Sequence, residues 1–419
     1  VAFARENSPL YRELYHHLPD RIEHPSALPV IDKKMLMERF DDWCTDRAVT
    51  LRAAEALVDD PARIGERFLG KYTLYTTSGT TGRRGIFLAD DRTMAVVTAM
   101  MLRWIGSCLS PGDILKIIAR RGRTAMVMAT GGHFASAVAA ARLRRRQGKR
   151  LEVLSAHMPL TELVNRLNRF QPAMLAPYAS IAAMLADEQA AGRLDIHPVL
   201  LALSAEGLPQ AEYGRIARVF DAKVGNSYAA SECMFMSAMC REGWLHVNAD
   251  WVVFEPVDAD HRPVAPGEPS HTILISNLAN RVQPILRYDL GDSVVQRPDS
   301  CPCGSPLPAI RVHGRSADVL TFRTSHGETR VPPLALSQPI EAVPGITLFQ
   351  IAQTAPQTLE LRLQVAPTAN EDAVWGEAEA GLRSVLAAHG LEQVTLKRGG
   401  ELPKQGRGGK FREIIPLAD

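Results

Sequence analysis

The sequence has few of the features that mark a membrane protein, a nucleic-acid-binding protein or a disulfide-rich protein. No apolar run approaches the roughly 18–20 residues that span a bilayer. The 48 basic and 46 acidic residues leave a net charge of only +2, too little to hold a phosphate backbone over a long surface. Six cysteines among 419 residues are too sparse for a disulfide scaffold. We therefore expect neither a membrane nor a nucleic acid as partner.

The composition is that of an ordinary globular protein. Hydrophobic residues make up 46% of the chain and charged residues 22%, and the length allows two or three domains. Residues 1–15, VAFARENSPLYRELY, have the pattern of an amphipathic helix rather than of a signal peptide, which predicts a cytoplasmic location. We find no internal repeat and no low-complexity tract.

Apolar runs alternate with helical patterns from residue 113 to about residue 220. Strands are predicted at 113–119, 124–129 and 150–156, and helices at 133–146 and 160–170, the second of which is expected to begin at Thr161. Such alternation predicts parallel strands joined by crossover helices, which is a layered α/β domain. In these sheets ligands bind at the carboxyl ends of the strands.

Two later sections of the chain have a different predicted secondary-structure pattern. From about Val224 to residue 317, strands are separated by Pro, Gly, Asn and Asp with little helix between them, which predicts a β-rich subdomain or barrel. From Asp318 onward a hairpin, a long helix, a strand and a glycine-rich loop predict a separate α+β unit. We therefore expect an N-terminal domain at 1–317, β-rich from about 224, and a small C-terminal domain at 318–419.

Residues 75–85, YTTSGTTGRRG, combine small and hydroxyl-bearing side chains in a way that suits neither a core helix nor a core strand. Glycines allow backbone N–H groups to converge on one point and hydroxyls add donors, so the loop could hold an anion such as phosphate. It is not a Walker loop, because Gly79 and Gly82 are too close and no Gly-Lys-Ser/Thr follows. A solvated Ser/Thr/Gly hairpin is the alternative.

With its companions elsewhere, this loop resembles the phosphate-binding loop of the adenylate-forming superfamily of acyl- and aryl-CoA synthetases. Further segments resemble other motifs of that superfamily in the same order: SAEGLP at 204–209, NSYAASE at 226–232, RYDLGD at 287–292, GRSADVL at 314–320 and LPKQGRGGK at 402–410. The short length, ARENSPLYREL at the start and CPCG at 301–304 resemble the phenylacetate-CoA ligase branch. Fold, function and site residues follow from this resemblance as expectations.

The resemblance implies that the chain binds ATP and Mg²⁺. Thr80 and Glu232 are expected to be catalytic, with Glu232 as the Mg²⁺ ligand, because the reacting carboxylate and phosphates repel each other until positive charge intervenes. Tyr228 would stack on adenine, and Asp292 would accept hydrogen bonds from the ribose hydroxyls. The complete expected nucleotide-binding set is Thr77, Ser78, Gly79, Thr80, Thr81, Gly82, Ala205, Glu206, Asn226, Ser227, Tyr228, Ser231, Asp292 and Arg315.

The resemblance also assigns a catalytic lysine and a hinge. Lys410, after Gly409, would neutralise charge that builds up between the carboxylate and the α-phosphate, and Lys404 competes for this role. The gap between the two lysines is one residue longer than in the family. Asp318 is expected to be the hinge about which the C-terminal domain moves as a lid, so that a thiol can reach the adenylate.

Three cysteines and one histidine form a pattern typical of a tetrahedral zinc site. Cys301 and Cys303 make a Cys-x-Cys pair, and Cys240 and His246 lie about sixty residues upstream. Members of the phenylacetate-CoA ligase branch carry such a closed site, so we expect structural rather than catalytic Zn²⁺. Cys233 competes as a ligand, and we interpret it as a packing residue.

The acid substrate is indicated only in outline. The segments 130–135, 176–180 and 228–236 are expected to line its pocket, with His133, Phe134, Tyr178, Ala230 and Met234 as candidates. For His133 the alternative is a solvent-facing residue at a helix start, and for Met234 it is a core residue. The low polarity of these segments favours an acid that is aromatic or otherwise apolar.

The resulting hypothesis is a ligase that adenylates a carboxylic acid with ATP and Mg²⁺ and then transfers the acyl group to coenzyme A. The segment after the hinge, SHGETRVPP, departs from the family's usual glycine-rich loop, so an amine or a carrier protein stays open as acceptor. A zinc-containing scaffold protein that has lost catalysis is the alternative from another class. A homodimer is compatible with the sequence.

Overall fold

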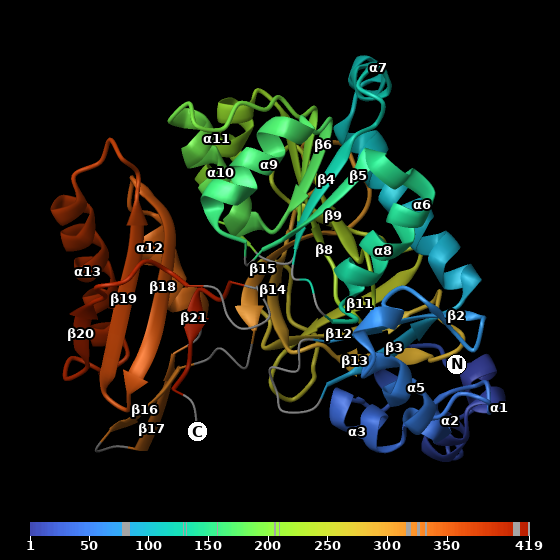
Figure 1. Cartoon of the computed structure of the whole chain (residues 1–419). Coiled ribbons are helices and arrows are strands. Elements are labelled where there is room, and N and C mark those ends of the chain that lie inside the picture. Colours follow the sequence, from blue (N-terminus) through green and yellow to red (C-terminus); the bar gives the residue numbers. More distant parts are fainter. Residues whose placement is uncertain are drawn as a thin grey trace.

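The protein is a mixed α/β protein, as the sequence predicted (Figure 1). The computed structural model describes residues 1–77, 84–128, 130, 132–156, 158–204, 207–208, 210–315, 320–324, 327–331, 333–404 and 411–417. Within them, no single helix is both long and apolar enough to cross a bilayer. Only α6 (Asp91–Cys108) and α7 (Pro111–Ala119), bent by 106° relative to each other, meet that test as a pair.

The largest sheet joins a parallel half to an antiparallel half. Among the described residues its strands lie in the order β5-β4-β6-β7-β8-β9-β10-β15-β14, and β5 to β8 are parallel. The parallel half and its helices are β4 (Thr124–Met128), α8 (Ala135–Gln147), β5 (Leu151–Ser155), α9 (Leu160–Phe170), β6 (Met174–Pro177), α10 (Ala179–Ala190), β7 (Leu200–Leu203), α11 (Gln210–Phe220) and β8 (Lys223–Tyr228). This is the alternation that the apolar runs predicted.

The prediction of a strand at 113–119 is wrong, because these residues form helix α7 (Pro111–Ala119). Ser110 accepts a hydrogen bond from the Asp113 backbone, and the Asp113 carboxylate accepts one from the Ser110 backbone. This capping box and Pro111 in the first turn start a helix regardless of the apolar run that follows. Local capping therefore decides the conformation here.

The N-terminal region differs from expectation in one detail. The expected single helix at 1–15 is two helices, α1 (Ala2–Asn7) and α2 (Pro9–Leu14), because Ser8 is extended and caps α2. The region continues with α3 (Lys33–Glu38), α4 (Phe40–Trp43), α5 (Leu51–Val58), a small sheet of β1 (Arg67–Phe68), β2 (Tyr72–Thr76) and β3 (Ile86–Ala89), and α6 (Asp91–Cys108). Similarly, α9 begins at Leu160 after Pro159, one residue before the expected Thr161.

The section after β8 is built of strands, as expected, but some of them extend the large sheet. These are β9 (Ser237–Met239), β10 (Leu245–Val247), β14 (Asp292–Gln296) and β15 (Ala309–Arg315). A separate antiparallel sheet comprises β11 (Val252–Val257), β12 (Thr272–Asn277) and β13 (Ile285–Asp289). One buried cluster joins β12 and β13 to β2, β3 and the N-terminal helices, so the region is continuous with the rest of the core.

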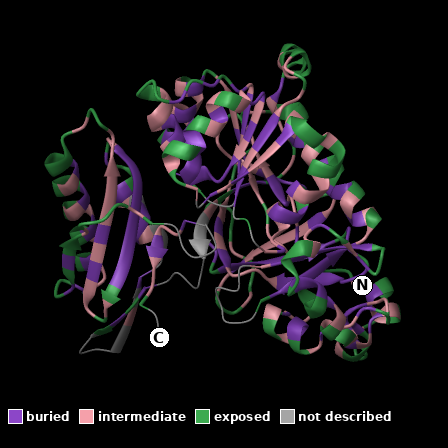
Figure 2. Ribbon diagram, in the orientation of Figure 1, coloured by how far each residue is buried: buried purple, intermediate pink, exposed green. Residues whose placement is uncertain are grey.

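The C-terminal section has its own core and lies to one side of the large sheet (Figure 1). It contains the hairpin β16 (Leu320–Thr324) and β17 (Gly327–Val331), α12 (Pro333–Glu341), β18 (Ile346–Ala355), β19 (Thr358–Val365), α13 (Glu371–Ala388), β20 (Thr395–Arg398) and β21 (Ile414–Ile415). Figure 2 shows most of β18 buried. Gln364 donates a hydrogen bond to Asp187 of α10 at 2.9 Å, and Leu348 and Phe411 pack into the core of the parallel half.

Candidate functional site

The predicted substrate and nucleotide residues follow the carboxyl ends of adjacent parallel strands. His133 and Phe134 follow β4, Tyr178 follows β6 and Ser204 follows β7, while Tyr228 ends β8. The ladders β4–β6, β6–β7 and β7–β8 are all parallel, so these positions share one edge of the sheet. An isolated bridge between Tyr178 and Ser204 brings two of these ends directly together. The edge is where a parallel α/β sheet ordinarily binds its ligand.

The glycine-rich loop connects two antiparallel strands, β2 and β3, and its base is fixed at this edge. The Thr77 amide donates to the Gly85 carbonyl at 3.0 Å, and the Gly85 amide donates to the Thr77 hydroxyl at 2.9 Å. The Thr76 amide donates to the His133 carbonyl at 2.7 Å, and Thr76 forms a bridge with Phe134. Both ends of the loop therefore lie beside the segment after β4.

Glu232 is held in a tight turn with its carboxylate in a buried position. Ala230 and Cys233 exchange backbone hydrogen bonds of 3.1 Å, which places Ser231 and Glu232 at the corner of the turn. The Tyr288 hydroxyl donates to Glu232 Oε1 at 2.9 Å, and the Asn277 side chain donates to the Glu232 carbonyl at 3.2 Å. Burial and the adjacent Glu232 charge raise the pKa of Tyr288 far above its ordinary value, so this hydroxyl remains a donor.

The structure brings Tyr228 and Asp292 together across the large sheet. The Tyr228 hydroxyl, at the end of β8, donates a hydrogen bond to Asp292 Oδ2 at the start of β14. Asp292 is 6% exposed and pairs in register with Arg315 of β15. Three predicted nucleotide-binding residues therefore converge although they are far apart in sequence.

Asn226 and Ser227 belong to a hydrogen-bonded group that also reaches the predicted adenine segment. The Asn226 amide group donates to the Tyr213 hydroxyl at 2.8 Å, and Asn226 Oδ1 accepts from the Ser227 amide at 2.8 Å. The same Tyr213 hydroxyl accepts from the Leu208 amide at 3.3 Å. Tyr213 on α11 therefore links the end of β8 to the segment that follows β7.

Two of the candidate pocket residues, His133 and Tyr178, are buried, and Phe134 is half-buried. His133 is 2% exposed, which excludes the solvent-facing alternative, and burial lowers the pKa of its imidazole. Among the described residues its ring nitrogens have no partner of good hydrogen-bond geometry. Phe134 packs against the core of the parallel half, and Tyr178 is buried within that core. Met234 is half-buried and packs against the small cluster that contains Val96, Val97 and Met100, in agreement with the core alternative.

Gln350 of β18 fixes both ends of the segment that carries Lys410. Its amide nitrogen donates to the carbonyls of Lys404 and Arg412, each at 2.9 Å, and its oxygen accepts from the Lys404 amide at 3.3 Å. The Lys404 ammonium pairs with Glu401 at the surface. Phe411 packs into the core of the parallel half, so one end of the segment lies against that part of the molecule.

The four predicted zinc ligands lie together. The side-chain nitrogen or sulfur atoms of Cys240, His246, Cys301 and Cys303 are all within 4.8 Å of one another. The Sγ atoms of Cys240 and Cys301 are 3.8 Å apart, which matches the edge of a tetrahedron with Zn–S bonds of about 2.3 Å. His246 Nδ1 lies 2.8 Å from the Leu307 carbonyl, so a proton on Nδ1 leaves Nε2 to bind a metal. The cluster could therefore hold a zinc ion.

Two short segments position these ligands. Cys240 follows β9, and its amide donates to the Trp244 carbonyl at 2.8 Å, which closes the turn into β10 where His246 lies. In the second segment the Gly304 amide donates to the Cys301 carbonyl at 3.0 Å. The competing ligand Cys233 is 2% exposed in the core next to Glu232, and burial raises the pKa of its thiol to about 12. Cys233 is therefore outside this cluster.

Several predicted residues lie outside the described part of the chain. These are Ser78, Gly79, Thr80, Thr81, Gly82, Ala205, Glu206, Asp318 and Lys410, together with the side chain of Arg315. Conversely, sequence reasoning assigned no role to Tyr288, Asn277, Tyr213 or Gln350, which position Glu232, Asn226 and the Lys410 segment. Only Tyr288 lies within a recognised motif, RYDLGD, and could have been found from it.

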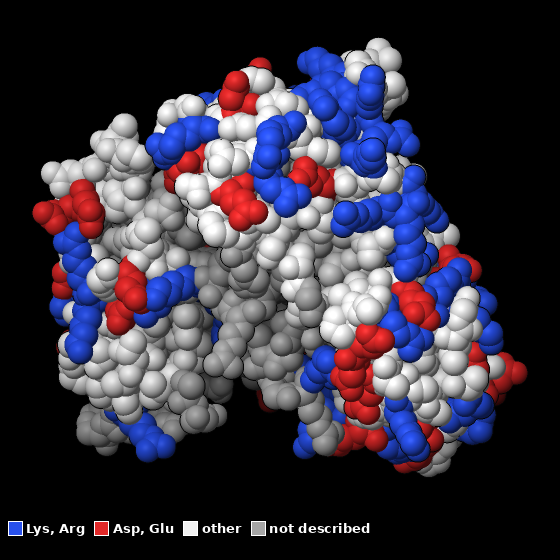
Figure 3. Space-filling model, in the orientation of Figure 1, with Lys and Arg blue, Asp and Glu red and all other residues white. Residues whose placement is uncertain are grey.

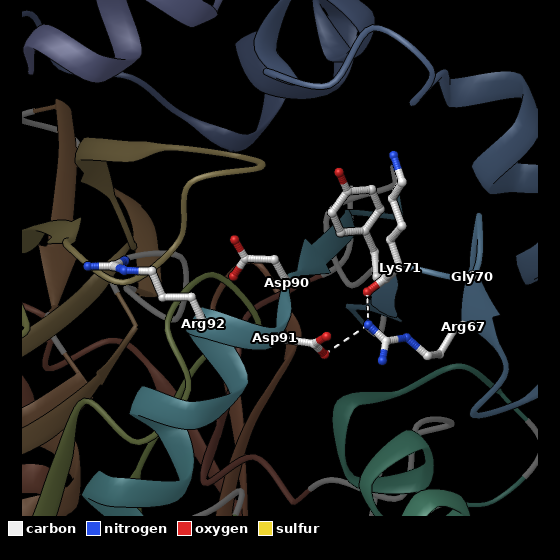
Figure 4. Close-up of a pocket in the computed structure, with 7 residues that line it drawn as sticks. Arg67, Gly70, Lys71, Asp90, Asp91 and Arg92 are labelled. Carbon is white, nitrogen blue, oxygen red and sulfur yellow. Dashed lines mark hydrogen bonds and ion pairs between the residues drawn. The ribbon is translucent and has the colours of Figure 1, made fainter.

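An open, charged surface pocket lies away from these residues. It has a volume of about 440 Å³ and is lined by Arg67, Gly70, Lys71, Tyr72, Asp90, Asp91 and Arg92 (Figure 4). Arg67 pairs with Asp91 at 2.8 Å across it. None of the described predicted site residues lines this pocket, so we do not include it in the candidate site.

Comparison with known proteins defines the fold. No family model matches the chain. Over 165 residues it is 27% identical to Protein CapK of Staphylococcus aureus; this alignment covers 38% of the chain and only 35% of CapK. In structure it resembles 2-hydroxyisobutyryl-CoA ligase in the postadenylation state with R3-HIB-AMP, with a TM-score of 0.70 and 20% identity over 100% of this chain and 86% of that one.

A second solved structure with a related fold is the amide bond synthetase McbA from Marinactinospora thermotolerans. Its TM-score is 0.52 at 12% identity, over 79% of this chain and 65% of McbA. The chain therefore has the fold of adenylate-forming acyl-CoA ligases. At these identities the comparisons define the architecture, and the chemistry has to be argued from the site.

Proposed function

We propose that the protein adenylates a carboxylic acid with ATP and transfers the acyl group to coenzyme A. One observation carries the proposal: two buried carboxylates, Glu232 and Asp292, are each held by a tyrosine hydroxyl near the same sheet edge. The chain has the fold of an adenylate-forming ligase, and from the NSYAASE and RYDLGD motifs we infer that Glu232 is the metal ligand and Asp292 the ribose acceptor. The ARENSPLYREL and CPCG segments support a place in the phenylacetate-CoA ligase-like branch.

In the proposed reaction a substrate carboxylate oxygen attacks the α-phosphorus of ATP. A P–O bond forms to the acid, the bond to the β-phosphate oxygen breaks and pyrophosphate leaves. Mg²⁺, held by Glu232, would neutralise phosphate charge in this step. The donors of the 77–82 loop would bind the phosphates, Tyr228 would cover the adenine ring and Asp292 would accept from the ribose. The thiolate of coenzyme A then attacks the acyl carbon, and AMP leaves.

We assign the catalytic lysine to Lys410 rather than to Lys404. The Lys404 ammonium is engaged by Glu401 at the surface, which reduces its availability for a developing negative charge. Phe411, directly after Lys410, packs against the core of the parallel half that also contains Tyr178 and Leu208. We also propose that residues 1–317 form the adenylation domain and 318–419 a lid that turns about Asp318.

The candidate pocket favours an apolar, aromatic acid. Phe134 and Tyr178 supply ring faces, and Ala230 next to Glu232 leaves space for a ring. His133 would offer the pocket a polar contact. Its imidazole is buried, and burial lowers its pKa, which favours the neutral ring. The neutral imidazole can donate through one nitrogen and accept through the other.

An amine is the second candidate acceptor, because the fold likeness extends to an amide bond synthetase. The adenylation half-reaction would be the same, and only the nucleophile that displaces AMP would differ. The scaffold alternative is disfavoured because Tyr288 and Tyr228 donate hydrogen bonds to the two carboxylates and Asn277 holds the Glu232 backbone carbonyl, which packing alone does not require.

The decisive experiment measures pyrophosphate release across aryl, heteroaryl and short aliphatic acids, with coenzyme A, an amine or no acceptor. We expect acid-dependent exchange between ATP and pyrophosphate, and thioester only when coenzyme A is present. Glu232→Gln and Lys410→Ala should each reduce the exchange rate by at least about 100-fold, with Lys404→Ala as the matched control. Full exchange activity in Lys410→Ala would refute its role, and no exchange with any acid would refute adenylation.

A further inference from the structure

Helix α7 is apolar yet packs against almost nothing. None of its nine residues is buried, and Ile114, Leu115 and Ile118 are 43%, 66% and 65% exposed. Leu102, near the end of the preceding helix α6, is 59% exposed. A helix in a globular protein ordinarily buries its apolar stripe, and a cluster of exposed apolar side chains marks an interaction site.

The position of α7 separates it from the candidate site. The helix leads into the start of β4, so it lies at the amino edge of the parallel strands, whereas the candidate site follows their carboxyl ends. Figure 1 shows α7 projecting from the top of the molecule. The exposed apolar residues of α7 therefore need a role other than substrate binding at that site.

Basic residues surround this projecting helix. Arg123 directly precedes Thr124, which pairs with Leu151, and Leu151 is directly preceded by Arg150. Lys223 starts β8 at the same edge of the sheet. Figure 3 shows Lys and Arg side chains gathered around the white tip at the top of the view. Further exposed cations in this part of the chain are Lys116, Arg121 and Lys149.

The acidic groups near this edge do not balance these cations. Asp113 is engaged by Ser110 as the cap of α7 and lies 4.0 Å from the Lys116 ammonium, so it offsets one of these cations. Asp195 Oδ1 lies 3.2 Å from His197 Nε2, and Asp221 is two residues before Lys223 in the sequence. The edge therefore combines an apolar protrusion with an excess of positive charge, which attracts an anionic partner.

We propose that α7 docks on an anionic lipid surface, with Ile114, Leu115 and Ile118 entering the interfacial region and the surrounding cations contacting lipid phosphates. A convex protrusion fits a deformable surface, whereas a folded protein would need a matching groove. A second copy of the chain would bring the same cations face to face. The inference departs from our expectation of no membrane partner, because an interfacial helix does not need the length of a spanning one.

The test is sedimentation of the 419-residue chain with vesicles, without ATP or acid, so it is independent of the proposed function. We expect binding to vesicles of phosphatidylcholine mixed with phosphatidylglycerol and little binding to phosphatidylcholine alone. Leu115→Ser/Ile118→Ser and Arg121→Glu/Lys223→Glu should each weaken binding at least about tenfold, and high salt should weaken it further. Leu69→Ser and Lys397→Glu, exposed residues elsewhere, are matched controls and should bind as the wild type does.

A separate variant protects the test against a folding defect. Ile118→Trp keeps the side chain apolar, and its fluorescence should shift to the blue when anionic vesicles are added, relative to the wild type. Absence of sedimentation with anionic vesicles, or unchanged binding of Leu115→Ser/Ile118→Ser, would overturn the proposal. So would a wild-type dimer that this double variant converts to monomer, because a second copy would then cover α7.

Discussion

The Cys/His cluster and the carboxylate pair are constructed differently. In the cluster, His246 and Cys301 are buried at 6% and 7% exposure and Cys240 and Cys303 are half-buried, whereas Asp292 and Glu232 are both buried at 6% and 8% exposure. The clearer difference lies in what the side chains face. The cluster closes on itself, because its four ligand atoms face one another within 4.8 Å. The carboxylates instead face tyrosine hydroxyls on other strands.

This difference in construction indicates that the cluster holds its ligand permanently, whereas the carboxylates bind a ligand that exchanges. A closed set of four protein ligands has no position for a substrate, which is the arrangement of a structural metal site. A carboxylate that accepts a hydrogen bond from a neutral hydroxyl keeps its negative charge. It can still bind a cation or accept a further hydrogen bond. We therefore expect a permanent ion in the cluster and an exchanging ligand at the carboxylates.

The largest effect should follow from opening the cluster. Cys301→Ala removes one ligand and leaves the others without their ion, so the β9–β10 turn and the 301–305 segment lose their shared anchor. We expect the free energy of unfolding to fall by more than about 4 kcal/mol, in the range of metal-site losses. Thermal unfolding, with zinc content measured by atomic absorption, checks this.

Cys108→Ala is the control for that experiment, because Cys108 is a half-buried thiol outside the cluster. It should retain the full zinc content. If Cys301→Ala and Cys108→Ala unfold at the same temperature, the cluster does not anchor the fold, and the contrast between a permanent and an exchanging site fails.

A smaller effect should follow from removing the tyrosine hydroxyls at the carboxylates. Tyr288→Phe deletes a hydrogen bond to a buried charge, worth about 1.5–3 kcal/mol, so kcat/KM for Mg·ATP should fall roughly 10–100-fold. Tyr228→Phe keeps a ring that can stack on adenine but loses the bond to Asp292, so its KM for ATP should rise by up to about tenfold. Steady-state kinetics of pyrophosphate release check both changes.

We expect both tyrosine variants to keep their zinc content, because the hydroxyls of Tyr288 and Tyr228 bond to Glu232 and Asp292 and not to the Cys/His cluster. If either variant lost zinc, the two groups would be one coupled unit. Wild-type kinetics in Tyr288→Phe would show that Glu232 does not depend on this hydroxyl for its position.

The sequence predicted the parallel half of the large sheet well, because there the apolar runs and helical patterns alternate without conflict. It failed at 113–119, where an apolar run follows a capping box and the cap decides the conformation. It also did not indicate that β9, β10, β14 and β15 extend the large sheet, since pairing between distant strands leaves no local pattern.

For the site, motif order and spacing predicted the four ligands that the structure brings together, Cys240, His246, Cys301 and Cys303. The partners of the functional groups were not predictable in the same way. Gln350 and Tyr213 act through hydrogen bonds to backbone or side-chain atoms distant in sequence, and such contacts depend on the tertiary fold. A single sequence indicates candidate functional residues through its motifs. It indicates less readily which other residues hold those candidates in position.

The smallest expected effect is a difference in how the carboxylate pair and the Cys/His cluster respond to pH. Burial and the Glu232 charge raise the pKa of Tyr288 above its ordinary value of 10.0. The folded state therefore keeps this proton after the unfolded state has lost it, so the free energy of unfolding should fall as the pH rises above about 10, by up to about 1.4 kcal/mol per pH unit. Tyr288→Phe should lack this component of the slope, which urea unfolding between about pH 9 and pH 11 can measure.

Other buried tyrosines with raised pKa values, such as Tyr15 and Tyr75, contribute equally to the wild type and to Tyr288→Phe, so they cancel in the difference. The cluster should respond in the opposite direction, because acid protonates thiolates and imidazole and releases the metal. Equal alkaline slopes in the two proteins would show that the Tyr288–Glu232 pair carries no proton linkage. Zinc loss that occurs in alkali rather than in acid would contradict the assignment of thiolate and imidazole ligands.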